Sequence, residues 1–421
     1  MHPLTRLLFV VAFALLAPNA QAAPATSYDI VIRNGHVIDG TGSPWYSADI
    51  AIKDGRIAAI GGLGNADAKQ VIDAHGMVVA PGFIDMLDQS GHTLLVDGHA
   101  PSKIFQGITT LVTGEGESIA PLDDRILAEE GSRAKPAWRT LDGYFDVLQK
   151  HGIAVNLGTY VGAATAREMV IGYGDREPTP DELKQMQAIV ARAMRDGAFG
   201  VSTALQYPPA TYSTTPELTA LAKTAASYGG IYATHMRSEG NGEAAALDEV
   251  FDIARTAHIP VEIFHLKVAG HENWGSMPKV IAKIDAARAQ GLDISADTYA
   301  YTAWGNDLAS FIPPWAHAGG TTKLLERLQD PQTRARIERD MQTPSDAWSN
   351  DWLEVPGPHA VEITSVQNPS LKNLEGRRLD EIASSWHAKP IDTLIDILIE
   401  DHAATDVAVF GMSQPDVTLA L

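Results

Sequence analysis

Three residues at the ends of predicted strands have side chains that could bind a metal ion. Glu115 follows the apolar segment 108–113, His235 ends the segment 230–235, and His265 lies in the segment 261–266. Two imidazoles and one carboxylate are a typical ligand set for catalytic zinc, which keeps one position open for water. Zinc would lower the pKa of that water and polarise a carbonyl group. From the spacing alone, histidines that only form hydrogen bonds at strand ends explain the pattern equally well.

A second polar group follows the apolar segment 292–296. Asp297, Tyr299 and Tyr301 come directly after this predicted strand. These side chains could bind a substrate, or they could satisfy backbone groups of a loop. Both interpretations stay open at this point.

All these candidates lie at or just after the C-terminal ends of short apolar segments. Seven such strands are predicted, at 82–87, 108–113, 153–160, 198–203, 230–235, 261–266 and 292–296. Helices separate most of them. The clearest is predicted at Asp181–Arg195, with a capping box formed by Thr179 and Glu182 and with Pro180 at the first helical position. This alternation predicts an α/β fold of the (β/α)8, TIM-like type, in which strand C-termini share the rim that holds the active site.

The segment 28–79 predicts a separate small β module. Short alternating strands are expected there, and Asn34-Gly35 and Asp54-Gly55 indicate two hairpins. Residues from about 309 to 359 interrupt the later alternation, so we expect an insertion that shapes the active-site face. Ser413 to Asp416 predicts the start of another helix. The chain then ends at Leu421 before an eighth strand, so we expect a truncated barrel over residues 80–421.

Composition and the N-terminus limit the function classes. The 421-residue chain carries a formal net charge of −20 and has no cysteine. This charge argues against nucleic-acid binding, and thiolate chemistry is excluded. Residues 1–22 combine a basic start, an apolar run and the motif Ala20-Gln21-Ala22, which predicts a cleaved signal peptide and a secreted or periplasmic protein. No membrane span is expected after cleavage.

Several motifs together resemble a known enzyme family. Asp29-Ile-Val-Ile-Arg-Asn-Gly35 and Ala80-Pro-Gly-Phe-Ile-Asp85 are similar to the opening of amidohydrolase-superfamily enzymes. Tyr232-Ala-Thr-His-Met-Arg237, His265-Leu-Lys-Val-Ala-Gly270 and Asp297-Thr-Tyr-Ala-Tyr-Thr-Ala303 resemble the N-acyl-D-amino-acid deacylases, also called D-aminoacylases. The resemblance covers nearly everything from Asp29 to Leu421.

The resemblance implies a β-sandwich joined to a barrel that hydrolyses the amide bond of N-acyl-D-amino acids. It assigns His235 and His265 to zinc. It also implies that Lys267 and Tyr299 hold the carboxylate and the carbonyl of the substrate, and Arg237 is a further predicted substrate-binding residue. A buried substrate carboxylate needs a cationic partner such as Lys267.

The sequence departs from the family pattern at three places. Leu87 and Gln89 replace a His-x-His pair, so one zinc ion is expected instead of two. The family's bridging cysteine is missing, and Glu115, or Glu117 in a shifted alignment, is expected to be the oxygen ligand. The family's general base, an aspartate in a Ser-Asp motif on the eighth strand, would follow Leu421, so this form is expected to have weak activity or none.

Two other functions remain open at the level of sequence. The same zinc site would suit a cyclic amide or an N-acetylated sugar. Alternatively, the chain is an exported, inactive binding protein on an amidohydrolase scaffold, because a fold alone does not determine a function.

Overall fold

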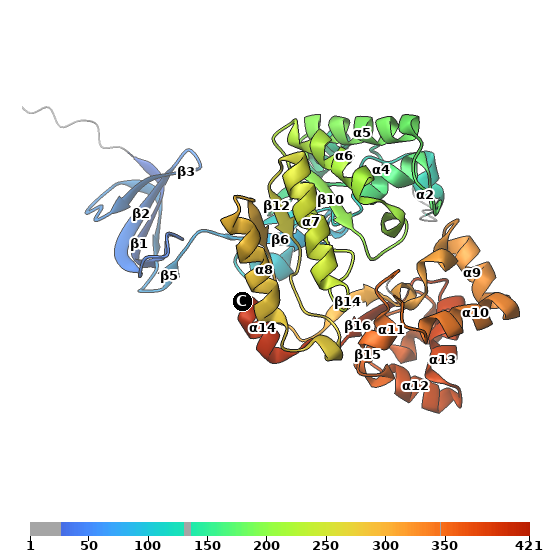
Figure 1. The fold of residues 1–421 in the computed structure, drawn as a ribbon. Coiled ribbons are helices and arrows are strands. Elements are labelled where there is room, and N and C mark those ends of the chain that lie inside the picture. The colour runs from blue at the N-terminus through green and yellow to red at the C-terminus, as the bar shows by residue number, and fades with distance from the viewer. Residues whose placement is uncertain (1–26, 130–135, 346) are drawn as a thin grey trace, which may run out of the picture. The chain divides into compact units, whose positions relative to one another are not determined.

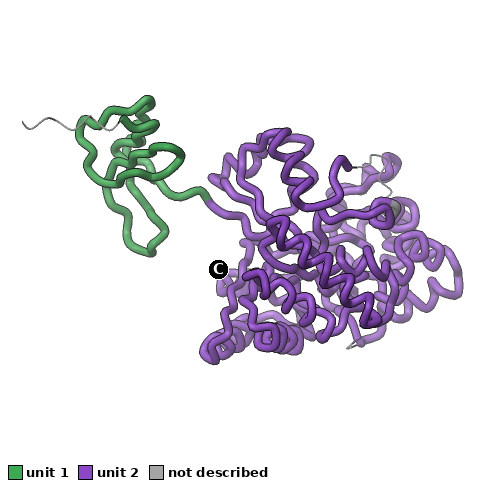
Figure 2. Tube along the Cα trace, turned by 90° about the horizontal axis from the view of Figure 1, so that it is seen from above, with its two compact units in different colours: residues 1–82 green, residues 83–421 purple. Residues whose placement is uncertain are grey.

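The computed structural model describes residues 27–129, 136–345 and 347–421, and the chain divides into two units (Figures 1 and 2). Unit 1 is Met1–Gly82 and unit 2 is Phe83–Leu421. The predicted signal peptide, residues 1–22, lies outside the described residues. Within those ranges, no helix has both the length and the apolar character that crossing a bilayer requires.

Unit 1 is a sheet of five strands. They are β1 Tyr28–Val37, β2 Tyr46–Lys53, β3 Arg56–Gly61, β4 Ala68–Asp73 and β5 Val78–Val79. The order is β3-β2-β1-β4, with β5 also beside β1. The described part of the unit is one sheet, so the β-sandwich stays a prediction.

The two predicted hairpins of unit 1 have different outcomes. Asp54 and Gly55 join β2 to β3, with φ angles of 51° and 70°, as the Asp-Gly pattern predicts. The hairpin predicted at Asn34-Gly35 is wrong, because both residues lie inside β1 at a bulge. The reason is the length of β2, which pairs with β1 on both sides of this bulge.

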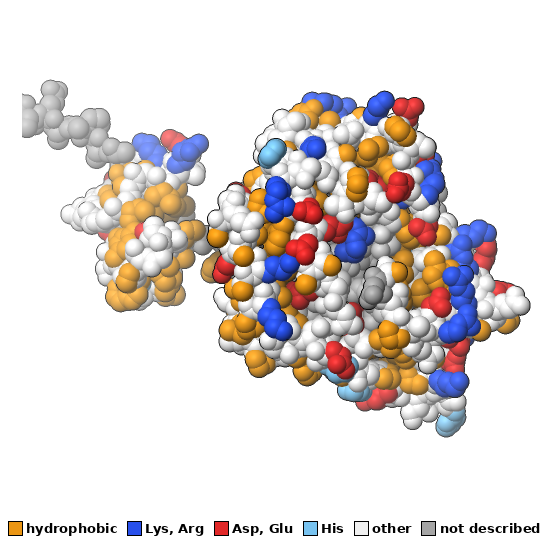
Figure 3. Space-filling model, in the orientation of Figure 1, with side chains coloured by type: hydrophobic (Ala, Val, Ile, Leu, Met, Phe, Trp, Pro, Cys, Tyr) orange, Lys and Arg blue, Asp and Glu red, His pale blue; other side chains and the backbone are white. Residues whose placement is uncertain are grey.

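Apolar side chains are exposed on the sheet of unit 1. Figure 3 shows them gathered on the face of this unit that is in view. The exposed residues include Ile57, Ile60, Val71, Met77 and Val78.

Unit 2 contains an arc of parallel strands. They are β6 Phe83–Asp88, β7 Ile108–Thr113, β8 Asn156–Thr159, β9 Val161–Gly162, β10 Gly200–Ala204, β11 Ile231–His235, β12 Val261–Ile263 and β13 Ile294–Ala296. β8 pairs with β7, and β9, which follows β8 after one residue, pairs with β10. Each remaining strand pairs in parallel with the next along the chain. The α/β fold is therefore confirmed, whereas the closed barrel and its truncation stay predictions.

Helices pack along the parallel strands of unit 2, and Figure 1 shows several of them beside β10 and β12. They are α1 Pro101–Ile104, α2 Asp124–Glu129, α3 Leu141–His151, α4 Ala163–Val170, α5 Pro180–Arg195, α6 Thr215–Ala226, α7 Glu243–Ala257 and α8 Met277–Ala289. The helix predicted at Asp181–Arg195 is confirmed as α5. Its capping box joins Glu182 N to Thr179 Oγ1 at 3.3 Å and Thr179 N to Glu182 Oε2 at 2.8 Å.

A second apolar core lies in a lobe of unit 2. The lobe contains the antiparallel strands β14 Trp304–Asp307, β15 Val361–Ser365 and β16 Asp406–Val409, and the helices α9 Thr321–Gln329, α10 Pro331–Met341, α11 Asp351–Glu354, α12 Leu379–Trp386 and α13 Pro390–Glu400. The predicted insertion at 309–359 lies inside this lobe. The last helix, α14 Gln414–Ala420, begins after Ser413 as predicted and contacts α8.

Candidate metal centre

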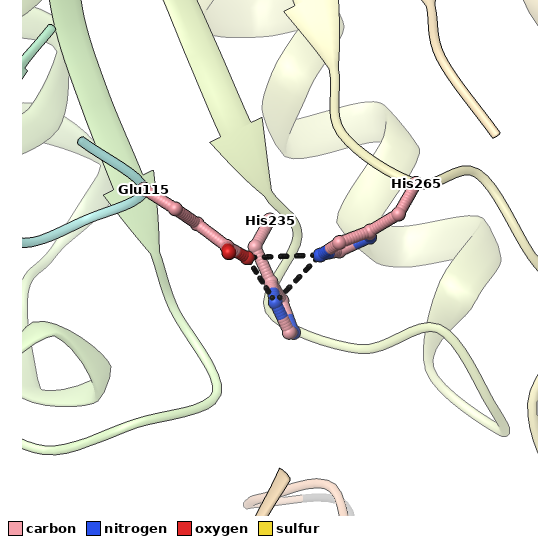
Figure 4. Close-up of side chains that lie close together, drawn as sticks. All are labelled: Glu115, His235 and His265. Atoms are coloured by element: carbon pink, nitrogen blue, oxygen red, sulfur yellow. Dashed lines mark hydrogen bonds and ion pairs between the residues drawn. The ribbon is translucent and has the colours of Figure 1, made fainter. Parts of the chain in front are cut away.

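Glu115, His235 and His265 converge on one point of unit 2 (Figure 4). Glu115 Oε1 lies 3.0 Å from His235 Nδ1 and 2.9 Å from His265 Nε2, and the two nitrogens are 3.1 Å apart. Ligand atoms around a tetrahedral zinc ion are separated by about 3.3–3.4 Å, given zinc–ligand bonds of roughly 2.0–2.1 Å. The three donor atoms are therefore spaced so that a small shift would accommodate zinc.

Backbone geometry explains how Glu115 reaches this point. It lies in a tight loop after β7, between Gly114 with φ 94° and Gly116 with φ 68°. A Cβ atom on Gly116 would lie 2.5 Å from the Cβ of Ala204 in β10. Only glycine fits there without displacing the loop.

The two histidines come from neighbouring strands. His235 is the last residue of β11, and His265 lies two residues after the end of β12. His265 has φ 37°, which is unusual for a residue with a side chain, and its N–H donates to Asp297 Oδ1 at 2.5 Å. This contact holds the backbone of His265 against the end of β13.

Each candidate ligand has a hydrogen-bond partner on the side away from the other two. Gln89 Nε2 donates to Glu115 Oε2 at 2.7 Å, which leaves Oε1 for an ion. Gln206 Oε1 lies 3.1 Å from His235 Nε2, and Glu239 Oε1 lies 3.0 Å from His265 Nδ1. Such partners orient metal ligands and select the imidazole tautomer.

The electrostatics of the cluster favour positive charge at its centre. Burial would raise the pKa of Glu115, but hydrogen bonds from both histidines hold it well below its ordinary value. Burial and the Lys267 charge lower the pKa of His265, but Glu239 and Glu115 outweigh them and raise it to about 9. A donor set that retains a proton this strongly also suits a divalent cation, so the residues present fit a metal ion.

The cluster opens into a cavity of about 570 Å³, which includes space open to solvent. Its walls come from the strand ends and from the lobe. The lining residues are Glu115, Gln206, Tyr207, His235, Glu239, His265, Lys267, Ala269, Tyr299, Trp304, Gly305, Ser349, Asp351 and Glu354. Burial and nearby acidic groups raise the pKa of both Asp351 and Glu354.

Two of the three predicted substrate-binding residues line this cavity. Lys267 is 2% exposed, and its Nζ lies 2.7 Å from both Glu239 Oε1 and His265 Nδ1. Tyr299 also lines the cavity, and burial raises its pKa. Because a lysine has three N–H groups and one is donated to Glu239, Lys267 keeps at least one for a ligand in the cavity.

Arg237 is not brought to the cavity. Its guanidinium forms an ion pair with Glu249 at 3.0 Å and donates to the carbonyls of Thr211 and Ser213. Its role in substrate binding stays a prediction, and in the structure this side chain ties the loop after β10 to α7.

The structure also shows where Glu117, Leu87 and Gln89 lie relative to the donor cluster. Glu117 does not belong to the donor cluster, which contains Glu115. Leu87 packs against an apolar cluster that includes Val112 and Phe264, whereas Gln89 contacts the candidate ligand Glu115.

Three residues of the site were missed by sequence reasoning. Gln206 follows the end of β10 and Glu239 lies four residues after His235, so both had the strand-end signal used for the other candidates. Asp351 lies in α11 of the lobe and had no such signal.

Comparisons with known proteins agree with the motifs. Residues 70–348 match the amidohydrolase family. Residues 15–83 match the N-terminal domain of the urease alpha subunit. The D-aminoacylase of Alcaligenes xylosoxydans xylosoxydans is 40% identical over 283 residues, which are 66% of this chain and 58% of that protein. The chain thus spans less than two thirds of this relative.

Solved structures share the fold. A crystal structure of D-aminoacylase has a TM-score of 0.75 and 32% identity, covering 93% of this chain and 73% of that chain. N-acyl-D-glutamate deacylase from Bordetella bronchiseptica, in complex with zinc and a phosphonate inhibitor, has a TM-score of 0.76 and 29% identity, covering 94% and 74%. The chain therefore belongs to the amidohydrolase family, in the group that contains the D-aminoacylases.

Proposed function

We propose that the protein hydrolyses the amide bond of N-acyl-D-amino acids with one bound zinc ion. The observation that carries this proposal is the convergence of Glu115 Oε1, His235 Nδ1 and His265 Nε2 at the wall of a cavity that also holds Lys267. The names of the similar proteins, D-aminoacylase and N-acyl-D-glutamate deacylase, support this substrate class, and zinc in the latter supports the metal.

In this proposal the chain positions the reactants. A zinc ion held by the three ligands would supply an activated water molecule and polarise the scissile carbonyl. Lys267 would bind the α-carboxylate of the substrate with its remaining N–H group. The Tyr299 hydroxyl, whose pKa is raised by burial and by nearby carboxylates, stays protonated and would donate to the carbonyl oxygen.

The test is a comparison of N-acetyl-D-amino acids with their L enantiomers, using purified zinc-loaded protein and a measurement of released amine. We expect weak but D-specific hydrolysis, in line with the weak activity expected of residues 1–421 without the family's general base, together with about one zinc per chain. A protein that neither binds zinc nor hydrolyses any of these amides would contradict the proposal and would favour an exported binding protein.

We also propose that the protein is exported and that residues 1–22 are removed. The apolar run and the small residues Ala20 and Ala22 support this proposal. N-terminal sequencing of the protein recovered outside the cytoplasm is expected to begin at Ala23. An intact N-terminus in that fraction would contradict it.

A further inference from the structure

The lobe reaches the metal centre through two consecutive hydrogen bonds. His235 Nε2 lies 3.1 Å from Gln206 Oε1, and Gln206 Nε2 donates to Asp351 Oδ1 at 2.9 Å. Asp351 is the first residue of α11 and lies 145 residues after Gln206. The contact therefore joins a strand-end loop to the lobe.

The acceptor at Asp351 fixes the direction of this chain of hydrogen bonds. An amide NH₂ group can only donate, so it turns toward Asp351, and the amide oxygen of Gln206 then faces His235. Because an amide oxygen can only accept a hydrogen bond, Nε2 of His235 carries the proton. In the neutral imidazole that binds a metal ion, the lone pair is then on Nδ1, which is the atom that faces Glu115 and His265.

Asp351 is itself held firmly within the lobe. It is 2% exposed, and its Oδ2 lies 3.3 Å from Asn306 Nδ2 and 3.4 Å from Ser310 Oγ. These contacts engage Oδ2 and leave Oδ1 to accept from Gln206 Nε2.

We propose that Asp351 is a positioning residue for the metal centre, which acts through Gln206 to present Nδ1 of His235 as a ligand. This inference rests on the zinc site of the proposed function. Partners of this kind typically change metal affinity about 10–100-fold when they are removed. The lobe therefore contributes to metal binding without supplying a ligand.

The test is the zinc dissociation constant of the whole chain, measured by competition with a chromophoric chelator. We expect Gln206→Leu and Asp351→Ala each to weaken zinc binding about 10–100-fold. The double variant is expected to bind no more weakly than Gln206→Leu, because Asp351 acts through that residue. Asp351→Asn keeps an acceptor oxygen and is expected to restore most of the affinity.

The matched control is Asp401→Ala. Asp401 is also buried in the lobe, where it accepts from Gln367 N, Asn368 N and Thr405 Oγ1, and it does not line the cavity. This variant is expected to lower the Tm and leave the zinc affinity unchanged.

Two results would overturn the inference alone. The first is an Asp351→Ala protein that binds zinc as tightly as wild type. The second is a double variant whose fold-loss of zinc affinity equals the product of the losses in the two single variants. If Asp351→Ala does not fold, the ¹⁵N chemical shifts of His235 in the zinc-loaded wild-type protein provide the test. We expect the proton on Nε2, and a proton on Nδ1 would contradict the inference. A wild-type chain without bound zinc would overturn the proposed function as well.

Discussion

Each imidazole of the metal centre faces the cavity with a different ring nitrogen. His235 presents Nδ1 and His265 presents Nε2 to Glu115. The opposite nitrogens meet Gln206 and Glu239. Metal-bound histidines commonly donate their second N–H to such oxygen atoms, so these two hydrogen bonds prepare both rings for the same ion.

At the residue scale, Lys267 allows a direct test of substrate recognition. We expect Lys267→Ala to raise KM about 10–100-fold for N-acyl-D-amino acids, because a charged hydrogen bond worth roughly 1.5–3 kcal/mol is lost. Neutral amides without a carboxylate should show little change. Steady-state kinetics on both substrate types provide the measurement.

The control for Lys267 is Lys283→Ala, which removes an exposed ion pair with Asp248. Zinc content is measured in all samples, because Lys267 Nζ also lies close to His265. An equal loss for charged and neutral substrates would show that Lys267 does not recognise the carboxylate.

The sequence could indicate strand-end residues, but it could not show which way each side chain turns. Glu115, His235 and His265 share a strand-end position, and the structure brings them together. Arg237 lies only two residues after His235, yet its side chain turns to Glu249 in α7. A short motif contains no information about such a distant partner.

At the scale of elements, a buried ion pair joins α4 to α6. Arg167 Nη1 lies 2.7 Å from Glu217 Oε2, and the two side chains are 0% and 1% exposed. We expect Arg167→Met to lower the free energy of unfolding by about 3–5 kcal/mol, because the Glu217 carboxylate would remain buried without a cation. Urea denaturation provides the measurement.

The double variant Arg167→Met/Glu217→Met should recover much of this stability, because neither charge then stays buried. Lys283→Met, at the exposed pair with Asp248, is the control and should cost less than about 1 kcal/mol. A loss in Arg167→Met no larger than in this control would contradict the interpretation.

His317 should make the lobe sensitive to acid. Burial lowers the pKa of His317 to about 4, and the opposing effect of the backbone at Ile312 and Ala309, which favours the protonated ring, is smaller. The unfolded chain, in which the histidine pKa is near 6.5, binds more protons between these values, so stability falls as the pH decreases from about 6.5 to 4. Protonation of His317 lowers the free energy of unfolding by at most about 3 kcal/mol.

The measurement is the free energy of unfolding of wild type and His317→Gln between pH 4 and 7. The variant should show a shallower dependence on pH, because the substituted side chain does not titrate. Identical slopes in the two proteins would show that His317 does not cause the acid sensitivity.

Local signals predicted the repeating elements well. The strand predicted at 108–113 is β7, and the capping box of Thr179 marks the start of α5 as expected. Asn34-Gly35 failed because the same dipeptide suits a bulge as well as a hairpin, and the pairing partner decides between them. That partner, β2, is a matter of tertiary structure.

At the scale of the whole molecule, zinc should stabilise the two units unequally. All three donor atoms of the metal centre belong to unit 2. Free zinc at 100 times its dissociation constant stabilises a single-site protein by about 2.7 kcal/mol. Differential scanning calorimetry with and without zinc should therefore show one transition that shifts by a few degrees and one that does not. Equal shifts of both transitions would contradict this assignment.

The strand pairing of the lobe could not be predicted from the sequence alone. β14 pairs with β16, so residues near 305 lie beside residues near 408. The segment predicted as an insertion gave no sign of this long-range pairing, because the intervening helices α12 and α13 resemble those of the strand–helix repeat. Asp351 was missed for the same reason, since its role depends on a contact with Gln206 across 145 residues.

The most direct test of the account is the zinc affinity of Glu115→Ala, His235→Ala and His265→Ala beside the wild-type chain. Metal analysis and chelator competition should give about one zinc per wild-type chain and a loss of tight binding in each variant. His75→Ala, at an exposed histidine of unit 1, is the control and should bind like wild type. A His265→Ala protein that retains one tightly bound zinc ion would contradict the account.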